Sequence, residues 1–415
     1  MYICDKTHTK PAYKPGLERW SLYKGLWIKY WKEFQNIYDE TFKEKYGELT
    51  QRHKLEVRKL ISCGRFQNGF NRYYCPDCGT MLVVPFTCKS RLCLSCARKR
   101  LFGWSLNLSH IMNTELEHTH VTFTIPGTIA KLLFERKYEP LQMMSLTTSL
   151  YKSLLCSSAK VKGKEYQPGI LATLHKSGNS LNYNPHVHMI ATKEFVNTLT
   201  GEILGAPFLP YRKIRFLWKK AFLVHLRKQN MINDEEFIRF TEIYKNGFHV
   251  YFQSVTGNNN DKLFRTAEYI ATGYFHNSQI QEIDNEKRTI TFKYKKMVDR
   301  GSRQKHFSYK TISIFEFMAK MLYYLPEKHR KMLRYYGIYA HNVQKKLDQI
   351  EKNSWAKAIE HSFNKQPEKC PECNQQILHD TVFSSLADKE IRRIMKTHDL
   401  VNGYFIPKKK KIRAP

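Results

Sequence analysis

The order of apolar and polar residues changes several times along the chain. Three segments alternate apolar and polar positions, as half-buried strands do: residues 118–125, 169–175 and 186–192. Segments with helical spacing separate them, notably over residues 128–155 and 211–230. A polar loop at 257–261 precedes a further helix, and residues 288–296 again have a strand pattern. The patterning predicts an α+β fold in which helices flank a sheet.

Both ends of the chain have helical patterns. Trp20, Trp27 and Trp31 recur four to seven positions apart in the first 60 residues, which predicts a helical arm whose tryptophans pack a small core. The last hundred residues also have mainly helical patterns, and a cysteine-rich stretch follows the first arm. We therefore expect four parts: 1–60, 61–108, 109–300 and 301–415.

The charge of the chain indicates a polyanionic partner. Lysine and arginine number 69 against 37 aspartates and glutamates, which gives a net charge of +32. The 25 tyrosines and 25 phenylalanines lie among these cations and suit base stacking as well as phosphate contact. A nucleic acid is therefore favoured over a membrane surface. The run from Lys408 to Lys411 adds little, because such tails are commonly solvated.

The sequence predicts no membrane partner. It contains no run of 18 or more apolar residues, and its first residues lack the basic-then-apolar order of a secretory signal. We expect a cytoplasmic protein. In that reducing compartment, ten cysteines that cluster in C-x-x-C pairs are expected to bind metal rather than to form disulfides.

Two cysteine pairs predict a structural zinc site. Cys75-Pro-Asp-Cys78 and Cys93-Leu-Ser-Cys96 are separated by fourteen residues, and two such turns can close one tetrahedral thiolate site. Cys63 and Cys88 exceed the four ligands that one zinc needs. One of them replaces a cysteine of these pairs, or both help to form a second site. Nearby cations are expected to contact DNA phosphates, unless they are only a solvated face: Lys89, Arg91, Arg98, Lys99 and Arg100.

A further pair, Cys370-Pro-Glu-Cys373, lies near the C-terminus without an obvious second pair. It is a candidate for a second zinc site, with His361, His379 or Cys4 as completing ligands. A metal-free reduced turn is the alternative.

The segment His186-Val187-His188 is the candidate for a second kind of metal site. In a strand, both imidazoles project from one face while Val187 points the other way, so that two nitrogen ligands face one divalent ion. Two partly buried structural histidines are the alternative. A third ligand is expected. His120, which shares a strand face with Thr122 and Thr124, is a candidate if its strand neighbours that of His186, and a structural histidine is the alternative. Other candidates are Glu268 and Gln253.

The order of these motifs resembles the rolling-circle transposases of the insertion-sequence-91 family, which are His-hydrophobic-His endonucleases. The segments that carry the resemblance, besides the His186/His188 strand, are Thr87-Cys88-Lys-Ser-Arg91, His120-Val-Thr-Phe-Thr-Ile-Pro126, Tyr269-Ile-Ala-Thr-Gly-Tyr274, Glu316-Phe317, Leu325-Pro326 and Arg334-Tyr335-Tyr336-Gly337. The resemblance covers nearly the whole chain. It implies a nuclease domain over 109–300 with a central antiparallel sheet flanked by helices, behind a zinc-binding module over 61–108.

The resemblance also implies a chemistry. Mg²⁺ or Mn²⁺ at the histidines polarises the scissile phosphate while Tyr269, Tyr274 or both attack it, which leaves a 5′-phosphotyrosine and a free 3′-hydroxyl. The implied partners are single-stranded DNA, hairpins at the ends of a mobile element and target DNA, in the nucleoid of a bacterium or archaeon. A plasmid replication initiator or relaxase and a non-catalytic zinc-dependent regulator are the alternatives.

The spacing of the two tyrosines departs from the family pattern. They are usually four residues apart, whereas Tyr269 and Tyr274 are five apart, about 140° around a regular helix. Either one tyrosine works alone, or a bulge beside Gly273 returns both to one face.

Overall fold

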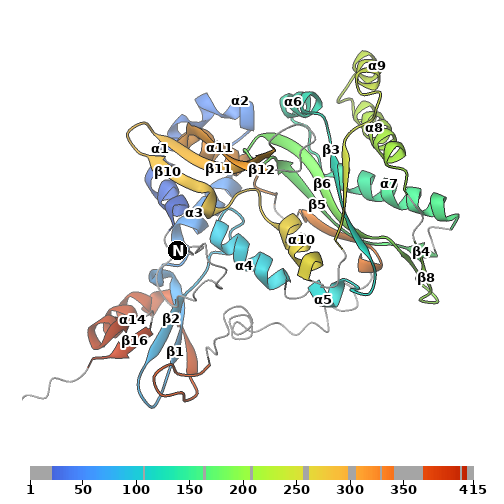
Figure 1. Ribbon diagram of the computed structural model, residues 1–415. Helices are drawn as coiled ribbons and strands as arrows, with labels where there is room; N and C mark the ends of the chain where they lie inside the picture. The colour runs from blue at the N-terminus through green and yellow to red at the C-terminus, as the bar shows by residue number, and fades with distance from the viewer. Residues whose placement is uncertain are drawn as a thin grey trace, which may run out of the picture. The chain divides into compact units, whose positions relative to one another are not determined.

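The computed structural model describes residues 21–105, 108–161, 165–205, 209–255, 261–297, 305–327, 330–340, 368–401 and 404–408. Trp20, Cys4, His361 and residues 409–411 lie outside these ranges. As far as it is described, the chain divides into two compact units (Figure 1). The first contains Met1–Ala97, Ile314–Met318 and Glu351–Pro415, and the second contains Arg98–Ser313 and Ala319–Ile350. The predicted region 301–415 is thus divided between both units.

The first unit begins with the predicted helices. These are α1 (Leu22–Thr41), α2 (Lys43–Tyr46) and α3 (Gln51–Ser62). Helix α1 starts at Ser21, whose side chain accepts a hydrogen bond from the Lys24 amide at 3.1 Å. One face of α1 is aromatic and buried, and it comprises Tyr23, Trp27, Tyr30, Phe34 and Tyr38. The predicted tryptophan core is present at Trp27, which is fully buried against Phe34.

A five-stranded antiparallel sheet forms the rest of this unit, in the order β14-β1-β2-β16-β15. The strands are β1 (Gly69–Tyr74), β2 (Met81–Pro85), β14 (Leu378–Phe383), β15 (His398–Val401) and β16 (Tyr404–Pro407). Helix α14 (Ser384–Thr397) packs Ile391 and Ile394 against Phe70. Arg72 on β1 also pairs with Asp380 and Glu390. The C-terminal region therefore contains strands as well as the predicted helices, because its segments complete a sheet that the cysteine-rich hairpin begins.

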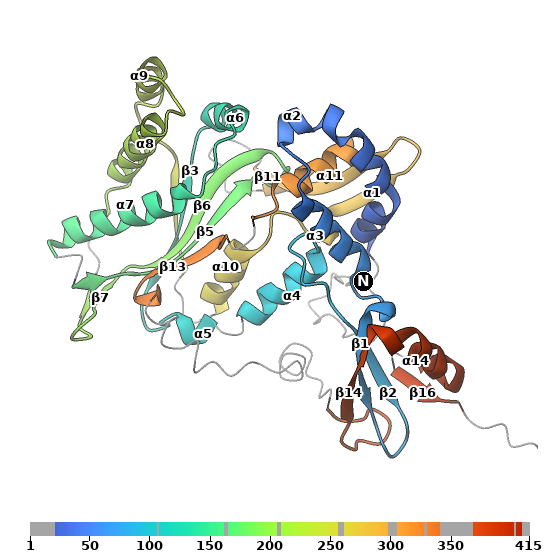
Figure 2. The same cartoon turned by 180° about the vertical axis from the view of Figure 1, so that it is seen from behind.

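The second unit is built on an antiparallel sheet in the order β13-β5-β6-β3-β9. Figure 2 shows β13, β5, β6 and β3 side by side. The strands are β3 (His118–Thr124), β5 (Gly169–Ser177), β6 (Tyr183–Thr192), β9 (Val250–Ser254) and β13 (Leu333–Gly337). The three segments with alternating patterns are β3, β5 and β6. The predicted central antiparallel sheet is confirmed.

Alternation along the strands gives this sheet two different faces. Val121, Val187 and Met189 point into a core with four helices, which are α6 (Gly127–Glu135), α7 (Gln142–Ala159), α8 (Tyr211–Lys228) and α9 (Asp234–Ile243). The helical pattern over 128–155 forms two helices because Lys137 adopts a left-handed conformation, at φ 52°, and Pro140 follows it.

On the opposite face, Leu171 and Ile190 pack against helix α10 (Asp261–Ala271) through Leu263, Ala267 and Ile270. Figure 1 shows α10 lying along this side of the sheet. Burial of these three apolar residues fixes which side of α10 faces the strands. The helix thereby holds its remaining positions, including 269, close to the middle strands.

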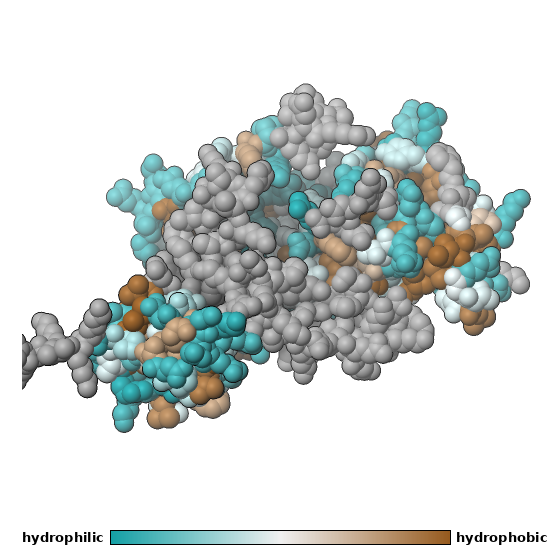
Figure 3. Space-filling view, turned by 60° about the horizontal axis from the view of Figure 1, so that its bottom comes forward, coloured by the Kyte–Doolittle hydropathy of each residue, from teal (hydrophilic) through white to brown (hydrophobic). Residues whose placement is uncertain are grey.

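The second unit has two smaller sheets. One has the order β10-β11-β12, with β10 (Ile280–Asp284), β11 (Thr289–Met297) and β12 (Lys305–Ser313), and helix α11 (Ile314–Tyr323) follows. The other contains β4 (Tyr166–Gln167), β7 (Phe195–Asn197) and β8 (Ile203–Leu204). Among the described residues, no helix is both long and apolar enough to cross a membrane. Hydrophobic side chains lie in separate groups among hydrophilic ones in Figure 3.

Candidate functional site

Three histidines meet on one face of the central sheet. His186 and His188 lie two residues apart on β6, and His175 lies opposite His186 on the neighbouring strand β5. Because side chains alternate along a strand, all three project toward α10 rather than into the core beneath Val187. One ring nitrogen from each lies within 4.8 Å of the others. The sheet therefore presents three nitrogen ligands at one point.

The other ring nitrogen of each histidine has a partner in the protein. His175 donates from Nε2 to the Ile270 carbonyl at 2.8 Å, and His186 donates from Nδ1 to the Asn184 carbonyl at 2.7 Å. His188 Nδ1 lies 3.0 Å from His120 Nε2 and 3.1 Å from Thr122 Oγ1. These bonds leave Nδ1 of His175 and Nε2 of the other two for a ligand. Metal-binding histidines are oriented by such contacts.

Two of the three rings lie in a setting that keeps them neutral. Burial lowers the pKa of His175 to about 3, with a further contribution from nearby His186, and burial also lowers the pKa of His186. A neutral imidazole has the lone pair that a metal ligand needs. The donor set, the oriented tautomers and the low pKa values therefore fit a divalent cation.

His120, the predicted third ligand, lies next to this group rather than in it. Its Nε2 lies 3.0 Å from Nδ1 of His188, and His120 is not one of the three grouped histidines. Burial lowers its pKa to about 4. Glu268 on α10 does not belong to the group of three within the described part of the chain. Gln253 is exposed on β9 and lies opposite His120. His175 was not predicted as a metal ligand. The sequence did contain an indication of its role, because the predicted strand over 169–175 ends at this residue.

The two candidate tyrosines have different environments. The Tyr269 ring, on α10, lies 6.0 Å from the His188 ring, centroid to centroid, and 56% of the residue is exposed. Partial burial raises its pKa. Tyr274 lies beyond the end of α10 at Ala271, and its hydroxyl donates to the Met321 carbonyl at 2.8 Å. Burial raises the pKa of Tyr274 as well.

The helix thus contains no bulge between the two tyrosines, because it ends before the second one. Tyr269 faces the histidines, while the hydroxyl of Tyr274 is occupied by a carbonyl elsewhere in the unit. The structure brings together the His186/His188 pair and Tyr269, and it places Tyr274 apart from them.

A first group of cysteines in the other unit contains Cys63, Cys88, Cys93 and Cys96. The Sγ atoms of Cys63 and Cys96 are 3.5 Å apart, and those of Cys88 and Cys96 are 3.6 Å apart. Four thiolates around one zinc lie about 3.8 Å from one another, given a Zn–S distance of about 2.3 Å. The buried Lys24 ammonium donates to the backbone carbonyl of Cys63 at 2.6 Å, so this lysine holds the backbone of one of the four cysteines.

A second group contains Cys75, Cys78, Cys370 and Cys373. The sulfur atoms of Cys75 and Cys373 are 3.4 Å apart, as are those of Cys78 and Cys370. The two turns have the same backbone bonds: the fifth residue donates to the first carbonyl in each, at 3.0 Å in one and 2.9 Å in the other. In each turn that fifth residue, Gly79 or Asn374, has a positive φ.

The predicted sharing of one ion by the pairs Cys75–Cys78 and Cys93–Cys96 is wrong. Because β1 pairs antiparallel with β14, Cys370 and Cys373 lie next to Cys75 and Cys78. Cys93 and Cys96 are instead grouped with Cys63 and Cys88. A signal for this was present: only Cys75-Pro-Asp-Cys78 and Cys370-Pro-Glu-Cys373 share the form Cys-Pro-acid-Cys. His379 is outside both groups, and its ring instead stacks on Tyr73.

The cations predicted to contact DNA lie on the surface of their own units. In the first unit, Lys89 is exposed and Arg91 is partly buried. In the second, Arg98, Lys99 and Arg100 are exposed at successive positions of α4 (Leu94–Ser105). Successive helical residues point about 100° apart, so these three spread around the helix instead of forming one face. Their contact with phosphates stays a prediction.

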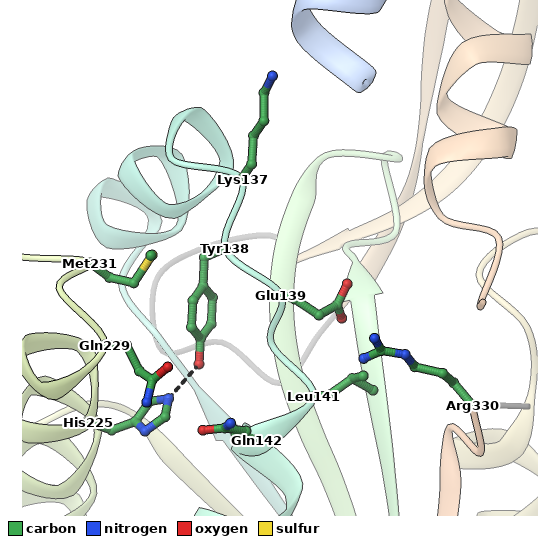
Figure 4. Close-up of a pocket in the computed structure, with 9 residues that line it drawn as sticks. All are labelled: Lys137, Tyr138, Glu139, Leu141, Gln142, His225, Gln229, Met231 and Arg330. Carbon is green, nitrogen blue, oxygen red and sulfur yellow. Dashed lines mark hydrogen bonds between the residues drawn. The ribbon is translucent and has the colours of Figure 1, made fainter. Parts of the chain in front are cut away.

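A cavity of about 330 Å³ is not lined by any of His175, His186 and His188. It is lined by Lys137, Tyr138, Glu139, Leu141, Gln142, His225, Gln229, Met231 and Arg330. Figure 4 shows Tyr138 pointing toward His225, and its hydroxyl lies 3.0 Å from Nε2 of that ring. Both residues belong to the helical layer that covers the opposite face of the sheet, so the cavity is not part of the histidine site.

Comparison with known protein families identifies two regions of the chain. Residues 33–125 match the model of a transposase zinc-binding domain, and residues 169–347 match a model described as a putative transposase. The first match contains six of the eight grouped cysteines, and the second contains the three histidines and Tyr269.

Two curated proteins are similar over most of their length. The transposase for insertion sequence element IS801 of Pseudomonas savastanoi pv. phaseolicola is 24% identical over 302 residues, which is 69% of this chain and 70% of that protein. The putative transposase y4qJ of Sinorhizobium fredii (strain NBRC 101917 / NGR234) is 24% identical over 318 residues, 72% of this chain and 77% of that protein. No solved structure matches the chain. The chain belongs to the insertion-sequence-91 family of transposases, with a zinc-binding domain in its N-terminal part.

Proposed function

We propose that the second unit nicks and rejoins single-stranded DNA at the ends of a mobile element, with Tyr269 as the one nucleophile. The observation that carries the proposal is the contact of the exposed Tyr269 ring with His188, one of three histidines that converge on one point. A nucleophile beside a metal-binding group is the arrangement that phosphodiester chemistry requires.

In the proposed reaction, the Tyr269 oxygen forms a bond to the scissile phosphorus and the bond from phosphorus to the 3′-oxygen breaks. The phenol proton is lost and the 3′-oxygen gains a proton, so the products are a 5′-phosphotyrosine and a 3′-hydroxyl. One phosphodiester replaces another, and no external energy source is needed. Attack by a different 3′-hydroxyl on the same phosphorus reverses the step and joins the strand elsewhere.

His175, His186 and His188 would hold Mg²⁺ or Mn²⁺, which supplies Lewis-acid stabilisation of the charge that develops on the phosphate. The chain's own contribution is orientation. The carbonyls of Ile270 and Asn184 fix the rings of His175 and His186. Ile270 is the neighbour of Tyr269 on α10, so one helical turn positions both the nucleophile and a ligand.

Zinc is the metal that we propose for the two cysteine groups in the first unit. Each has four thiols at spacings that suit tetrahedral thiolate ligation, and zinc with four thiolates is a structural rather than a catalytic site. Reduced cysteines also agree with the expected cytoplasmic location. This unit would contact the duplex, the hairpins at the element ends or the target DNA through its excess of cations.

The labelling pattern of the covalent product tests the proposed reaction. Single-stranded oligonucleotides that tile the DNA flanking the gene are incubated with the protein and Mn²⁺, and the products are separated under denaturing conditions. A strand labelled at its 3′ end is expected to migrate with the protein, whereas one labelled at its 5′ end is expected to appear as a shortened free strand. The reverse pattern, or no adduct with any tile, would contradict the proposal.

The identity of the third metal ligand gives a separate prediction. His175→Ala is expected to weaken Mn²⁺ binding by about 10- to 100-fold, because one of three nitrogen donors is lost. Free Mn²⁺ measured by electron paramagnetic resonance reports the affinity. His249→Ala is the control, since this exposed histidine lies next to β9 and outside the group. If His175→Ala leaves the affinity unchanged while His120→Ala lowers it, the ligand is His120, as the sequence predicted.

A further inference from the structure

The sheet β10-β11-β12 has one outer face that combines aromatic rings with lysines. Antiparallel pairing sets Lys293 opposite Tyr309 and Lys295 opposite Phe307, so all four side chains project from one side. Phe307 is 57% exposed and Tyr309 is 63% exposed. The Nζ atoms of Lys293 and Lys295 lie 5.6 and 5.9 Å from the Phe307 ring centroid. We call these four residues the aromatic–lysine face.

The other side of the same sheet is packed against the second unit. Ile290 and Phe292 are buried, and the Phe292 ring contacts that of Phe275 at 5.5 Å. Lys310 donates to the Ser180 carbonyl at 3.1 Å. The sheet therefore has a fixed orientation, and the exposure of Phe307 and Tyr309 follows from their position on the unpacked side.

The contacts of this sheet place it beside the histidine site. Asn179 donates from Nδ2 to the Lys295 carbonyl at 3.2 Å, and Ser180 accepts from Lys310. Both residues belong to the connection between β5 and β6, the strands that carry His175 and His186. Asn179 is four residues after His175, so at most about 14 Å of extended chain separates the two. Figure 1 shows β12 next to the β6 side of the central sheet.

We propose that the aromatic–lysine face binds the single strand next to the cleavage position, with bases stacked on Phe307 and Tyr309 and phosphates paired with Lys293 and Lys295. This inference rests on the proposed function and names the substrate contact of the same site. Exposed aromatics stack on any base, and adjacent ammonium groups match the phosphates that link those bases. The ammonium groups of Lys293 and Lys295 both lie over the Phe307 ring. Glu282 lies farther along this side, opposite Thr291.

Equilibrium binding of a fluorescein-labelled oligo(dT) of about 20 nucleotides tests the proposal. All variants carry Tyr269→Phe and no Mg²⁺ or Mn²⁺ is added, so binding is measured without chemistry. The pair Phe307→Ala and Tyr309→Ala is expected to weaken binding about tenfold or more, because each lost stacking partner costs a substantial part of the affinity. Phe307→Trp with Tyr309→Trp is expected to restore it.

Phe216→Ala is the matched control. Phe216 is 48% exposed on α8, so it is an exposed aromatic residue on a different surface. The Lys219 ammonium lies 5.0 Å from its ring centroid, but it is buried and donates to the Thr241 carbonyl. This variant is expected to bind within about twofold of the parent. The pair Lys293→Ala and Lys295→Ala should reduce the slope of log affinity against log salt by about 1.4, since each phosphate contact to a single strand contributes about 0.7.

Three outcomes would overturn the proposal. They are unchanged oligo(dT) affinity in the double alanine variant, an equal loss for a duplex of the same length, and a changed oligomeric state without a changed affinity, which would mark a protein interface. The result of this binding measurement does not depend on the result of the labelling experiment, because binding is measured without chemistry. A wild-type protein that forms no adduct, but whose affinity depends on Phe307 and Tyr309, would refute the nuclease chemistry and retain only the binding of a single strand at this face.

Discussion

Replacement of Tyr269 by phenylalanine is expected to abolish the covalent protein–DNA product, with a decrease on the order of 10³-fold or more in the rate of adduct formation. Phenylalanine keeps the ring that contacts His188 but lacks the oxygen that would bond to phosphorus. Adduct formation is measured with the 3′-labelled strand under denaturing conditions. The variant should still bind oligo(dT) and Mn²⁺ as the wild type does, which separates loss of the nucleophile from loss of the site.

Tyr274→Phe is the matched control for this prediction. Its hydroxyl is bonded to the Met321 carbonyl, so its removal is expected to cost about 1–2 kcal/mol of stability and to leave adduct formation largely intact. Thermal unfolding and adduct yield are compared on the same preparation. If a folded Tyr274→Phe protein forms no adduct while Tyr269→Phe does, the assignment of the nucleophile is wrong. Loss of the adduct in both variants would support two working tyrosines.

The joint substitution of Cys370→Ser and Cys373→Ser is expected to lower the zinc content from two ions per chain to one. Half of the second group is removed, and the binding free energy of a structural zinc, on the order of 10 kcal/mol, is lost from the first unit. Elemental analysis after gel filtration gives the zinc content. Because Cys370–Cys373 connects the C-terminal segment to the β1–β2 hairpin, limited proteolysis should also become faster between residues 368 and 408.

Cys156→Ser provides the control for zinc. Cys156 is a buried free thiol on α7 and belongs to neither group, so this variant should retain two ions. The alternative sharing, in which Cys75–Cys78 and Cys93–Cys96 hold one ion, makes a different prediction for the joint substitution. A zinc content that does not change in the Cys370→Ser, Cys373→Ser protein would support that sharing and would contradict the grouping in the structure.

Local patterns in the sequence were enough to predict the main elements of the second unit. The alternation over 118–125, 169–175 and 186–192 corresponds to β3, β5 and β6, because burial of one sheet face selects apolar residues at every second position. The same alternation puts His186 and His188 on one side. The membership of His175 was not predictable in this way, since it depends on the antiparallel register that sets it opposite His186.

The spacing of the two tyrosines shows a similar limit to prediction from the sequence. A regular helix through residues 269–274 would separate the two rings by about 140°, and two explanations were open. The helix instead ends at Ala271, and the Tyr274 hydroxyl finds a carbonyl on α11. Where a helix ends and which carbonyl a hydroxyl meets are decided by the packing of distant segments.

The sequence by itself determined the family and the α+β class, because both follow from the order of motifs and patterns along the chain. It also determined the His186/His188 pair and the cysteine turns, because each of these depends on neighbours within a few residues. The partners of those turns were decided only by the tertiary structure. Cys75 meets Cys373 across nearly 300 positions, because β1 pairs with β14 and not because of any spacing between motifs. Spacing along the chain constrains ligands that share a turn or a strand, whereas strand pairing selects which turns and strands meet.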